Sequence, residues 1–204
     1  MSMPNPHANS NLFITKAFFW CLLIVSTWAC SWVGPKPSFE DDFITYKISK
    51  DKHEIDGDNI TLFKADRLKF QAVFDSSAIY KSFIPENQYD INKLMGFSDC
   101  NSPHHGNSAR FGWNWMDNAL HIHAYTYVDG QRVVKSLGTV TLNETNTYEI
   151  QIQGNEYVFL LNGAETRMQR FCSGSVGLAY NLLPYFGGDE TAPHDIKIKI
   201  RLLE

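Results

Sequence analysis

The stretch RFGWNWMDNALHIHAYTYVDG, residues 110–130, indicates the fold of this chain because it reads as two strands around a tight turn. Asp117 and Asn118 tolerate the positive φ that a two-residue hairpin turn requires. A turn at this pair sets the register of the hairpin. The register then places apolar side chains opposite one another on a single face: Trp115 with Leu120, Trp113 with Ile122, and Phe111 with Ala124. We expect this face to be core.

The second face of the same hairpin carries polar and aromatic side chains. The register places Asn114 opposite His121, Gly112 opposite His123, and Arg110 opposite Tyr125. The next predicted turn, Asp129–Gly130, adds Tyr127 and Arg132 to this face. A glycine inside a strand often leaves room for a ligand, so Gly112 predicts a shallow slot beside His123.

Period-two alternation continues along most of the chain and predicts further strands. It is plain in residues 68–74, 148–152 and 196–202, and Gly154–Asn155 and Asn162–Gly163 are further turn signals. Only PENQYDINKLM, residues 85–95, is compatible with a short helix. Many short antiparallel strands predict an all-β fold: a two-sheet sandwich of jelly-roll type over residues 39–204, with a lipocalin-like barrel as the alternative.

The first thirty residues have the layout of a secretory signal. Lys16 precedes an apolar run, Ala17–Val25, that is shorter than the roughly 20 residues of a membrane span. We expect residues 1–29 to be a signal peptide and residues 30–38 a tether. Cys30 is a candidate lipidation site in a weak lipobox, which predicts a membrane-anchored lipoprotein of a bacterial envelope. Plain signal cleavage, giving a soluble periplasmic or secreted protein, is the alternative.

Export also affects the two cysteines that lie within the domain. An oxidising compartment allows Cys100 and Cys172 to form a disulfide, which would close a loop of about 70 residues and stabilise the fold by roughly 4 kcal/mol. Two separate buried thiols are the alternative.

The residue types on the polar face favour a carbohydrate ligand. Lys, Glu and Thr, which are the usual choices for a solvated strand, do not occur between Arg110 and Tyr125. Sugar rings stack on aromatic side chains, and their hydroxyl groups need planar hydrogen-bonding partners. The predicted ligand-binding residues are Arg110, Asn114, His121, His123, Tyr125 and Tyr127. A merely solvated sheet face is the alternative interpretation.

Other partners and cofactors have weaker support in the sequence. The net charge is −4 and the basic residues are scattered, so nucleic acid is not expected as a partner. His121 and His123 resemble a metal-binding pair, and His104 or His105 could supply a third ligand, but without a carboxylate we expect no metal there. Asp189 and Glu190 could hold calcium or hydrogen-bond a sugar; otherwise no cofactor is expected.

The segment TYEIQIQGNEYVFLLNG, residues 147–163, resembles the concanavalin A-like lectins and glucanases. This resemblance implies a jelly-roll sandwich and a polysaccharide or glycan partner. Residues 90–113 and 182–200 are similar to stretches of exported bacterial lipoproteins of unassigned function, which implies a location in the envelope but no activity. Membrane contact is expected through the N-terminal lipid only.

The enzymes of that superfamily can be compared motif by motif. The ExDxxE string of the glucanases does not occur here, nor do the RxExR and YxKxGxYxQ motifs of alginate lyases. The lyase inventory of arginine, amide, histidine and tyrosine is present in Arg110, Asn114, His121 or His123, and Tyr125. The sequence thus predicts carbohydrate binding, with a polysaccharide lyase acting on uronates and a structural envelope lipoprotein without a ligand as alternatives.

Overall fold

The computed structural model describes residues 42–57 and 61–203. The predicted signal peptide, Cys30 and the tether lie outside the described residues, as does the expected domain start at Phe39. Within the described ranges, no helix is both long and apolar enough to cross a bilayer.

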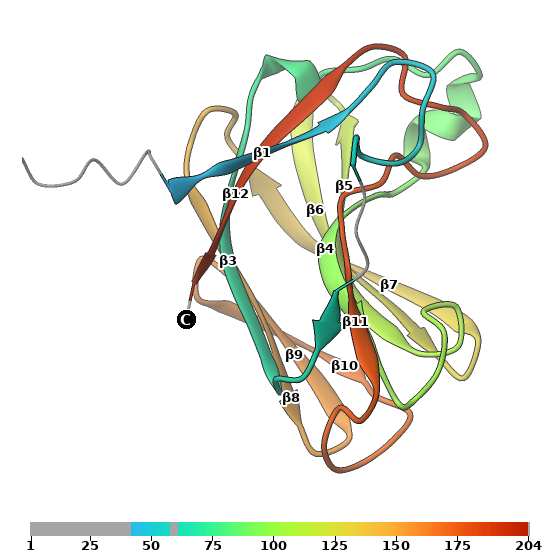
Figure 1. Cartoon of the computed structure of the whole chain (residues 1–204). Helices are drawn as coiled ribbons and strands as arrows, with labels where there is room; N and C mark the ends of the chain where they lie inside the picture. The colour runs from blue at the N-terminus through green and yellow to red at the C-terminus, as the bar shows by residue number, and fades with distance from the viewer. Residues whose placement is uncertain (1–41, 58–60, 204) are drawn as a thin grey trace, which may run out of the picture. The chain divides into compact units, whose positions relative to one another are not determined.

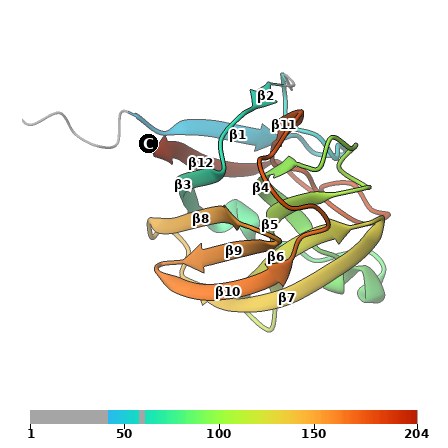
Figure 2. The same cartoon turned by 90° about the horizontal axis from the view of Figure 1, so that it is seen from below.

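Two antiparallel sheets of six strands face each other (Figure 1 and, seen from below, Figure 2). Sheet A has the order β1-β12-β3-β8-β9-β10, and sheet B has the order β2-β11-β4-β5-β6-β7. The strands of sheet A are β1 (Ile44–Ile48), β12 (Ile196–Leu203), β3 (Arg67–Phe74), β8 (Asn146–Gln153), β9 (Glu156–Leu161) and β10 (Ala164–Gln169). Those of sheet B are β2 (Leu62–Phe63), β11 (Ala179–Leu182), β4 (Asn92–Ser98), β5 (Ser108–Met116), β6 (Ala119–Val128) and β7 (Gln131–Val140). The fold is therefore the predicted all-β sandwich and not a barrel.

The core lies between the sheets and is built from alternate residues of facing strands. Trp113 and Phe111 of β5 are fully buried and pack against rings from sheet A. The Phe111 ring lies 5.8 Å from that of Phe70 and 5.1 Å from that of Tyr148, both edge to face. Such aromatic pairs stabilise beyond the area that they bury.

The predicted hairpin at residues 110–130 is confirmed in its register and its turns. Asp117 and Asn118 have φ values of 52° and 58°, and Trp113 pairs with Ile122 across β5 and β6. The turns at Asp129–Gly130, Gly154–Asn155 and Asn162–Gly163 also connect consecutive strands, as expected.

The prediction of a short helix within residues 85–95 is confirmed only for its first half. A 3-10 helix, η3 (Pro85–Tyr89), occupies its first half, and a second one, η2 (Ser76–Ala78), precedes it. The other half enters β4 at Asn92, because Leu94 and Phe97 bury their side chains in the sandwich. Tertiary burial overrides the weak helical pattern there.

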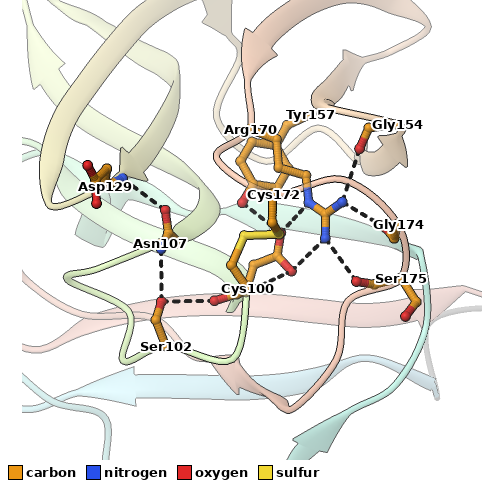
Figure 3. A network of polar contacts seen from close by, with 11 residues as sticks. Cys100, Ser102, Asn107, Asp129, Gly154, Tyr157, Arg170, Cys172, Gly174 and Ser175 are labelled. Carbon is orange, nitrogen blue, oxygen red and sulfur yellow. Dashed lines mark hydrogen bonds and ion pairs between the residues drawn. A yellow bond between two sulfur atoms is a disulfide. The ribbon is translucent and has the colours of Figure 1, made fainter.

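A disulfide joins Cys100 to Cys172, as predicted, with 5.8 Å between the Cα atoms. It ties the loop after β4 to the loop after β10, beside a buried ion pair (Figure 3). Arg170 donates from Nε to Asp99 Oδ2 at 2.6 Å, and both side chains are fully buried. Tyr157 donates to the same carboxylate oxygen at 2.8 Å. This disulfide and ion pair fix both loops to the end of the sandwich.

Candidate functional site

The polar face predicted from the hairpin is the outer face of sheet B. Asn114 pairs with His121, Gly112 with His123, Arg110 with Tyr125, and Ser108 with Tyr127. Arg132 of β7 pairs with Tyr127. All the predicted ligand-binding residues therefore share one face, but their surroundings divide them into two groups.

Asn114, His121 and His123 hydrogen-bond locally. His123 Nε2 donates to Asn114 Oδ1 at 3.0 Å, and His121 Nε2 donates to the Met116 carbonyl at 3.2 Å. Burial, and to a lesser extent His121, lowers the pKa of His123 to about 4, so this ring is neutral at pH 7. These contacts brace the end of the hairpin and leave few polar atoms for a ligand.

The prediction of a slot over Gly112 is wrong. A side chain at Gly112 would overlap Ile91, whose Cγ2 methyl group occupies the space above this glycine. Ile91 belongs to the segment that leads into β4, and the sequence pattern of β5 and β6 contains no information about that segment. Gly112 therefore permits close packing of protein against protein.

Arg110 is the residue of this face whose surroundings point most directly to a ligand. Its side chain is buried, with only 6% of the residue exposed, and Nε has no hydrogen-bond partner. Within residues 42–57 and 61–203, no carboxylate forms an ion pair with it. Burial lowers the pKa of the guanidinium, which nevertheless stays charged at neutral pH. A buried charge of this kind normally has a partner.

Lys93 adds a second cation that the sequence analysis did not identify. A bulge in β4 between Lys93 and Gly96 places Lys93 opposite Gly112 on the outer face. Its Nζ donates to the Ile91 carbonyl at 2.7 Å and lies 5.0 Å from the centre of the Tyr125 ring. Burial, then the charge of Arg110, lowers the pKa of Lys93 to about 8.

Tyrosines line the same region. Tyr125 is buried, and its ring lies 6.0 Å from the Arg110 guanidinium carbon and 5.9 Å from the Tyr127 ring. Burial, then the Tyr127 hydroxyl, raises the pKa of Tyr125 to about 12, so the phenol keeps its proton at neutral pH. Tyr125 can therefore donate a hydrogen bond or a proton.

Two loops and β11 surround this region. His104 and His105 come from the loop after β4, and their rings lie 4.2 Å apart. Tyr180 lies on β11, and Tyr185 forms a bridge with Lys93 beyond the end of that strand. A cavity of about 290 Å³ is lined by Arg110 and by Glu54, His104, Tyr180, Asn181, Leu182, Leu183, Pro184 and Tyr185. His104 was expected only as a possible metal ligand, and Tyr180 was not expected at all.

Glu190, in the acidic loop before β12, has hydrogen-bond partners within the protein. Glu190 accepts the backbone N–H groups of Phe83 and Ile84 at 2.7 Å each, and Asn87 Nδ2 at 3.0 Å. Its carboxylate thus holds the start of the η3 segment, and the calcium or sugar role of Asp189 and Glu190 stays a prediction.

Three potential metal ligands come close together at one place in the described part of the chain. The one such group within residues 42–57 and 61–203 is Asp99, Cys100 and Cys172. Both of its sulfur atoms belong to the disulfide. His104 and His105 therefore do not join His121 and His123 in a three-ligand site.

The arrangement can bind an anion and exchange protons with it. Arg110 and Lys93 supply positive charge in a partly dry site, where electrostatic interactions are stronger than in water. Tyr125 lies beside both cations, and the Tyr180, His104 and Tyr185 rings offer flat surfaces next to them.

No protein-family model matches the chain, and no curated protein matches its sequence. Solved structures do match its fold at low sequence identity. A glycoside hydrolase family 16 endo-glucanase from Bacteroides ovatus aligns with a TM-score of 0.53 at 7% identity, over 79% of this chain and 80% of that one. LamAcat from Zobellia galactanivorans gives 0.52 at 11%, over 80% and 78%.

The alginate lyase AlyC3 aligns with a TM-score of 0.51 at 11% identity, over 81% of this chain and 75% of its own. These alignments show a shared fold, which in the chain described here consists of two packed antiparallel sheets. The chain has the concanavalin A-like jelly-roll fold.

Proposed function

We propose that this protein binds an acidic, uronate-containing polysaccharide across the outer face of sheet B. The observation that carries the proposal is Arg110, a buried guanidinium without a carboxylate partner in the described part of the chain. Leaving a charge buried and unpaired costs free energy, and an anionic ligand would remove that cost. Lys93 lies on the same face, so a uronate carboxylate would meet two cations there.

The aromatic residues around Arg110 support a sugar as the carrier of the charge. Tyr125, Tyr180 and Tyr185 lie around the guanidinium and its cavity. Pyranose rings present apolar C–H faces that pack on such rings, while their hydroxyl groups bond to planar polar groups. A small inorganic anion would need the cations but not the rings.

The proposal is tested by measuring binding to polygalacturonate, alginate and the neutral glucan laminarin with Arg110→Gln. We expect the wild type to prefer the two polyuronates and the variant to bind them about 10- to 100-fold more weakly, as for loss of a charge-assisted contact. Arg67→Gln is the matched control, because Arg67 lies on sheet A and pairs with Glu149. Equal binding of laminarin and polyuronates by the wild type would refute an anion site.

The same variant separates a binding role from a structural one. Arg110 has no ion pair to lose among the described residues, so Arg110→Gln should leave the midpoint of chemical unfolding unchanged or raise it. A strongly lowered midpoint would show that Arg110 is a structural residue.

A polysaccharide lyase is the second candidate, favoured by the position of Lys93 beside Tyr125. With a pKa of about 8, part of the Lys93 population is a neutral amine at pH 7 to 8. In β-elimination this amine would take the proton from C5 of a uronate whose carboxylate is bound to Arg110. The C4–O4 bond then breaks, a C4=C5 double bond forms, and Tyr125 gives its proton to O4.

Lyase activity would appear as ultraviolet absorbance from the unsaturated product. We expect Tyr125→Phe to abolish turnover while most of the affinity remains, because the phenol acts in the transition state. Binding without absorbance by the wild type leaves a binding protein. If neither is found with an intact fold, the structural envelope protein is the remaining alternative.

We also propose that the chain is exported and anchored to the membrane through Cys30. The basis is the sequence layout of residues 1–30. Mass spectrometry of the membrane fraction should find a mature N-terminus at Cys30 that carries lipid. An unlipidated N-terminus would indicate plain cleavage, and a retained Met1 would contradict export by this route.

A further inference from the structure

Tyr180 and His104 form a pair of contacts at the wall of the outer-face cavity. The His104 backbone N–H donates to the Tyr180 hydroxyl oxygen at 3.1 Å. The same hydroxyl lies 2.9 Å from His104 Nδ1. No other hydrogen-bond partner of this hydroxyl occurs in residues 42–57 and 61–203.

These two contacts favour one tautomer of the neutral His104 ring. The backbone N–H donates to the Tyr180 oxygen, and the hydroxyl group can then donate its own proton to Nδ1. Nδ1 is then the acceptor, and the neutral imidazole carries its proton on Nε2. Burial, then the charges of Arg110 and His105, lowers the pKa of His104 to about 4, so the ring is neutral at pH 7.

The second nitrogen of His104 is available to a ligand. Its Nε2 has no hydrogen-bond partner within the described part of the chain, although His104 is partly buried. His104, Tyr180 and Arg110 all line the same cavity of about 290 Å³. A neutral donor beside Arg110 adds a hydrogen bond without adding a further positive charge that would repel the guanidinium.

We propose that His104 is a neutral hydrogen-bond donor of the acidic-sugar site, and that Tyr180 is the positioning residue that holds its Nε2–H tautomer. The ligand class is a sugar carboxylate that accepts from the Arg110 guanidinium and from His104 Nε2–H together. This inference rests on the proposed function. It adds a loop residue that would help the site to distinguish a sugar carboxylate, which has two acceptor oxygens, from a sugar hydroxyl group.

The loop that carries His104 is fixed before any ligand arrives. Cys100 is bonded to Cys172 at the start of the loop, and Ser108 Oγ donates to the His104 carbonyl at 2.7 Å. Asn107 Oδ1 accepts the Asp129 backbone N–H at 2.9 Å, which ties the loop to the β6–β7 turn. A fixed donor loses little conformational entropy on binding.

The tautomer can be tested without any ligand, by ¹⁵N NMR of the imidazole nitrogens at pH 7. We expect wild-type His104 to show an unprotonated Nδ1 and a protonated Nε2. In Tyr180→Phe, which keeps the ring and removes the hydroxyl, this preference should be lost. A proton on Nδ1 in the wild type, or unchanged signals in Tyr180→Phe, would overturn the role of Tyr180.

Binding of a mannuronate tetrasaccharide, with neutral laminaritetraose as control, tests the ligand. We expect His104→Ala to weaken tetramannuronate binding by about 10-fold, in the range of a hydrogen bond to a charged group. His104→Gln should retain most of the affinity, because its amide nitrogen can take the place of Nε2. His194→Ala is the matched control, because His194 Nε2 bonds the Ser77 carbonyl at 2.8 Å and His194 does not line this cavity; it should change affinity little.

The outcomes separate this inference from the function on which it rests. If the wild type and His104→Ala bind tetramannuronate equally while Arg110→Gln does not bind it, the anion site stands and the role of His104 is refuted. If the wild type does not prefer tetramannuronate to laminaritetraose, the proposed function fails, and the ligand assigned to His104 fails with it. Equal losses in His104→Gln and His104→Ala would also refute the donor role.

Discussion

Asp99→Asn should destabilise the domain far more than any substitution of a surface charge. The Asp99 carboxylate accepts from Arg170 Nε at 2.6 Å, Arg170 Nη2 at 3.0 Å, the Tyr157 hydroxyl at 2.8 Å and the Cys100 backbone N–H at 2.7 Å. Both members of the ion pair are fully buried. An asparagine has nearly the same shape, but it removes the charge and presents an amide group where a donor already points.

The expected magnitude follows from leaving Arg170 charged and buried. Its Nη1 and Nη2 atoms would still donate to the carbonyls of Gly154, Gly174 and Ser175 (Figure 3), but no anion would balance the charge. Breaking a buried ion pair by removing one partner costs about 3–5 kcal/mol. Urea denaturation at pH 7, followed by intrinsic fluorescence, should show this loss in the free energy of unfolding.

Two further variants identify the physical cause. Glu156→Gln removes a partner of Arg167, but both of those side chains are more than two-fifths exposed, so little change is expected. Asp99→Asn combined with Arg170→Met should recover part of the loss, since no buried charge is then left unpaired. The reasoning is refuted if Asp99→Asn behaves like Glu156→Gln, or if the double variant shows the full sum of two single losses.

Three other outcomes are expected. Replacing both Cys100 and Cys172 by alanine should lower the free energy of unfolding by about 4 kcal/mol, given their sequence separation of 72; two reactive thiols in the denatured, unreduced wild type would contradict the disulfide. Affinity for polyuronates should fall as pH rises through about 8, because Lys93 loses its charge there. The free energy of unfolding should instead rise with pH between pH 8 and the usual lysine pKa, because the unfolded chain then binds more protons than the folded chain. Affinity from titration calorimetry and stability from urea unfolding should therefore show opposite trends with pH. Gly96→Ala would overlap Ala109 and Arg110 on β5, so a loss of about 1–3 kcal/mol is expected from overpacking, and an unchanged urea midpoint would disprove that close approach.

Several features of the candidate site follow from local sequence patterns. The Asp117–Asn118 turn and the alternation around it correctly predict that Arg110, Tyr125 and Tyr127 share one face. The same pattern places Trp113 in the core. These predictions succeed because strand periodicity and turn geometry involve only near neighbours in the chain.

Other features of the site could not be predicted from local sequence patterns. The β4 bulge hides the face on which Lys93 lies, because an extra residue shifts the alternation. Tyr180 meets His104 although the two residues are 76 positions apart. Ile91 fills the space over Gly112, which the hairpin pattern alone leaves open.

The amino-acid sequence alone determines that the chain is a β-sandwich, how its hairpins are registered and which hairpin face is polar. The tertiary structure alone decides that the polar face is partly covered, that Arg110 is buried without an ion-pair partner in the described residues, and that His104 and Tyr180 stand beside it. Register depends on the period of the side chains along one strand. Burial on an outer face depends on where distant loops return, and in this protein the path of the loop that carries His104 is fixed by the disulfide and the buried Asp99–Arg170 pair.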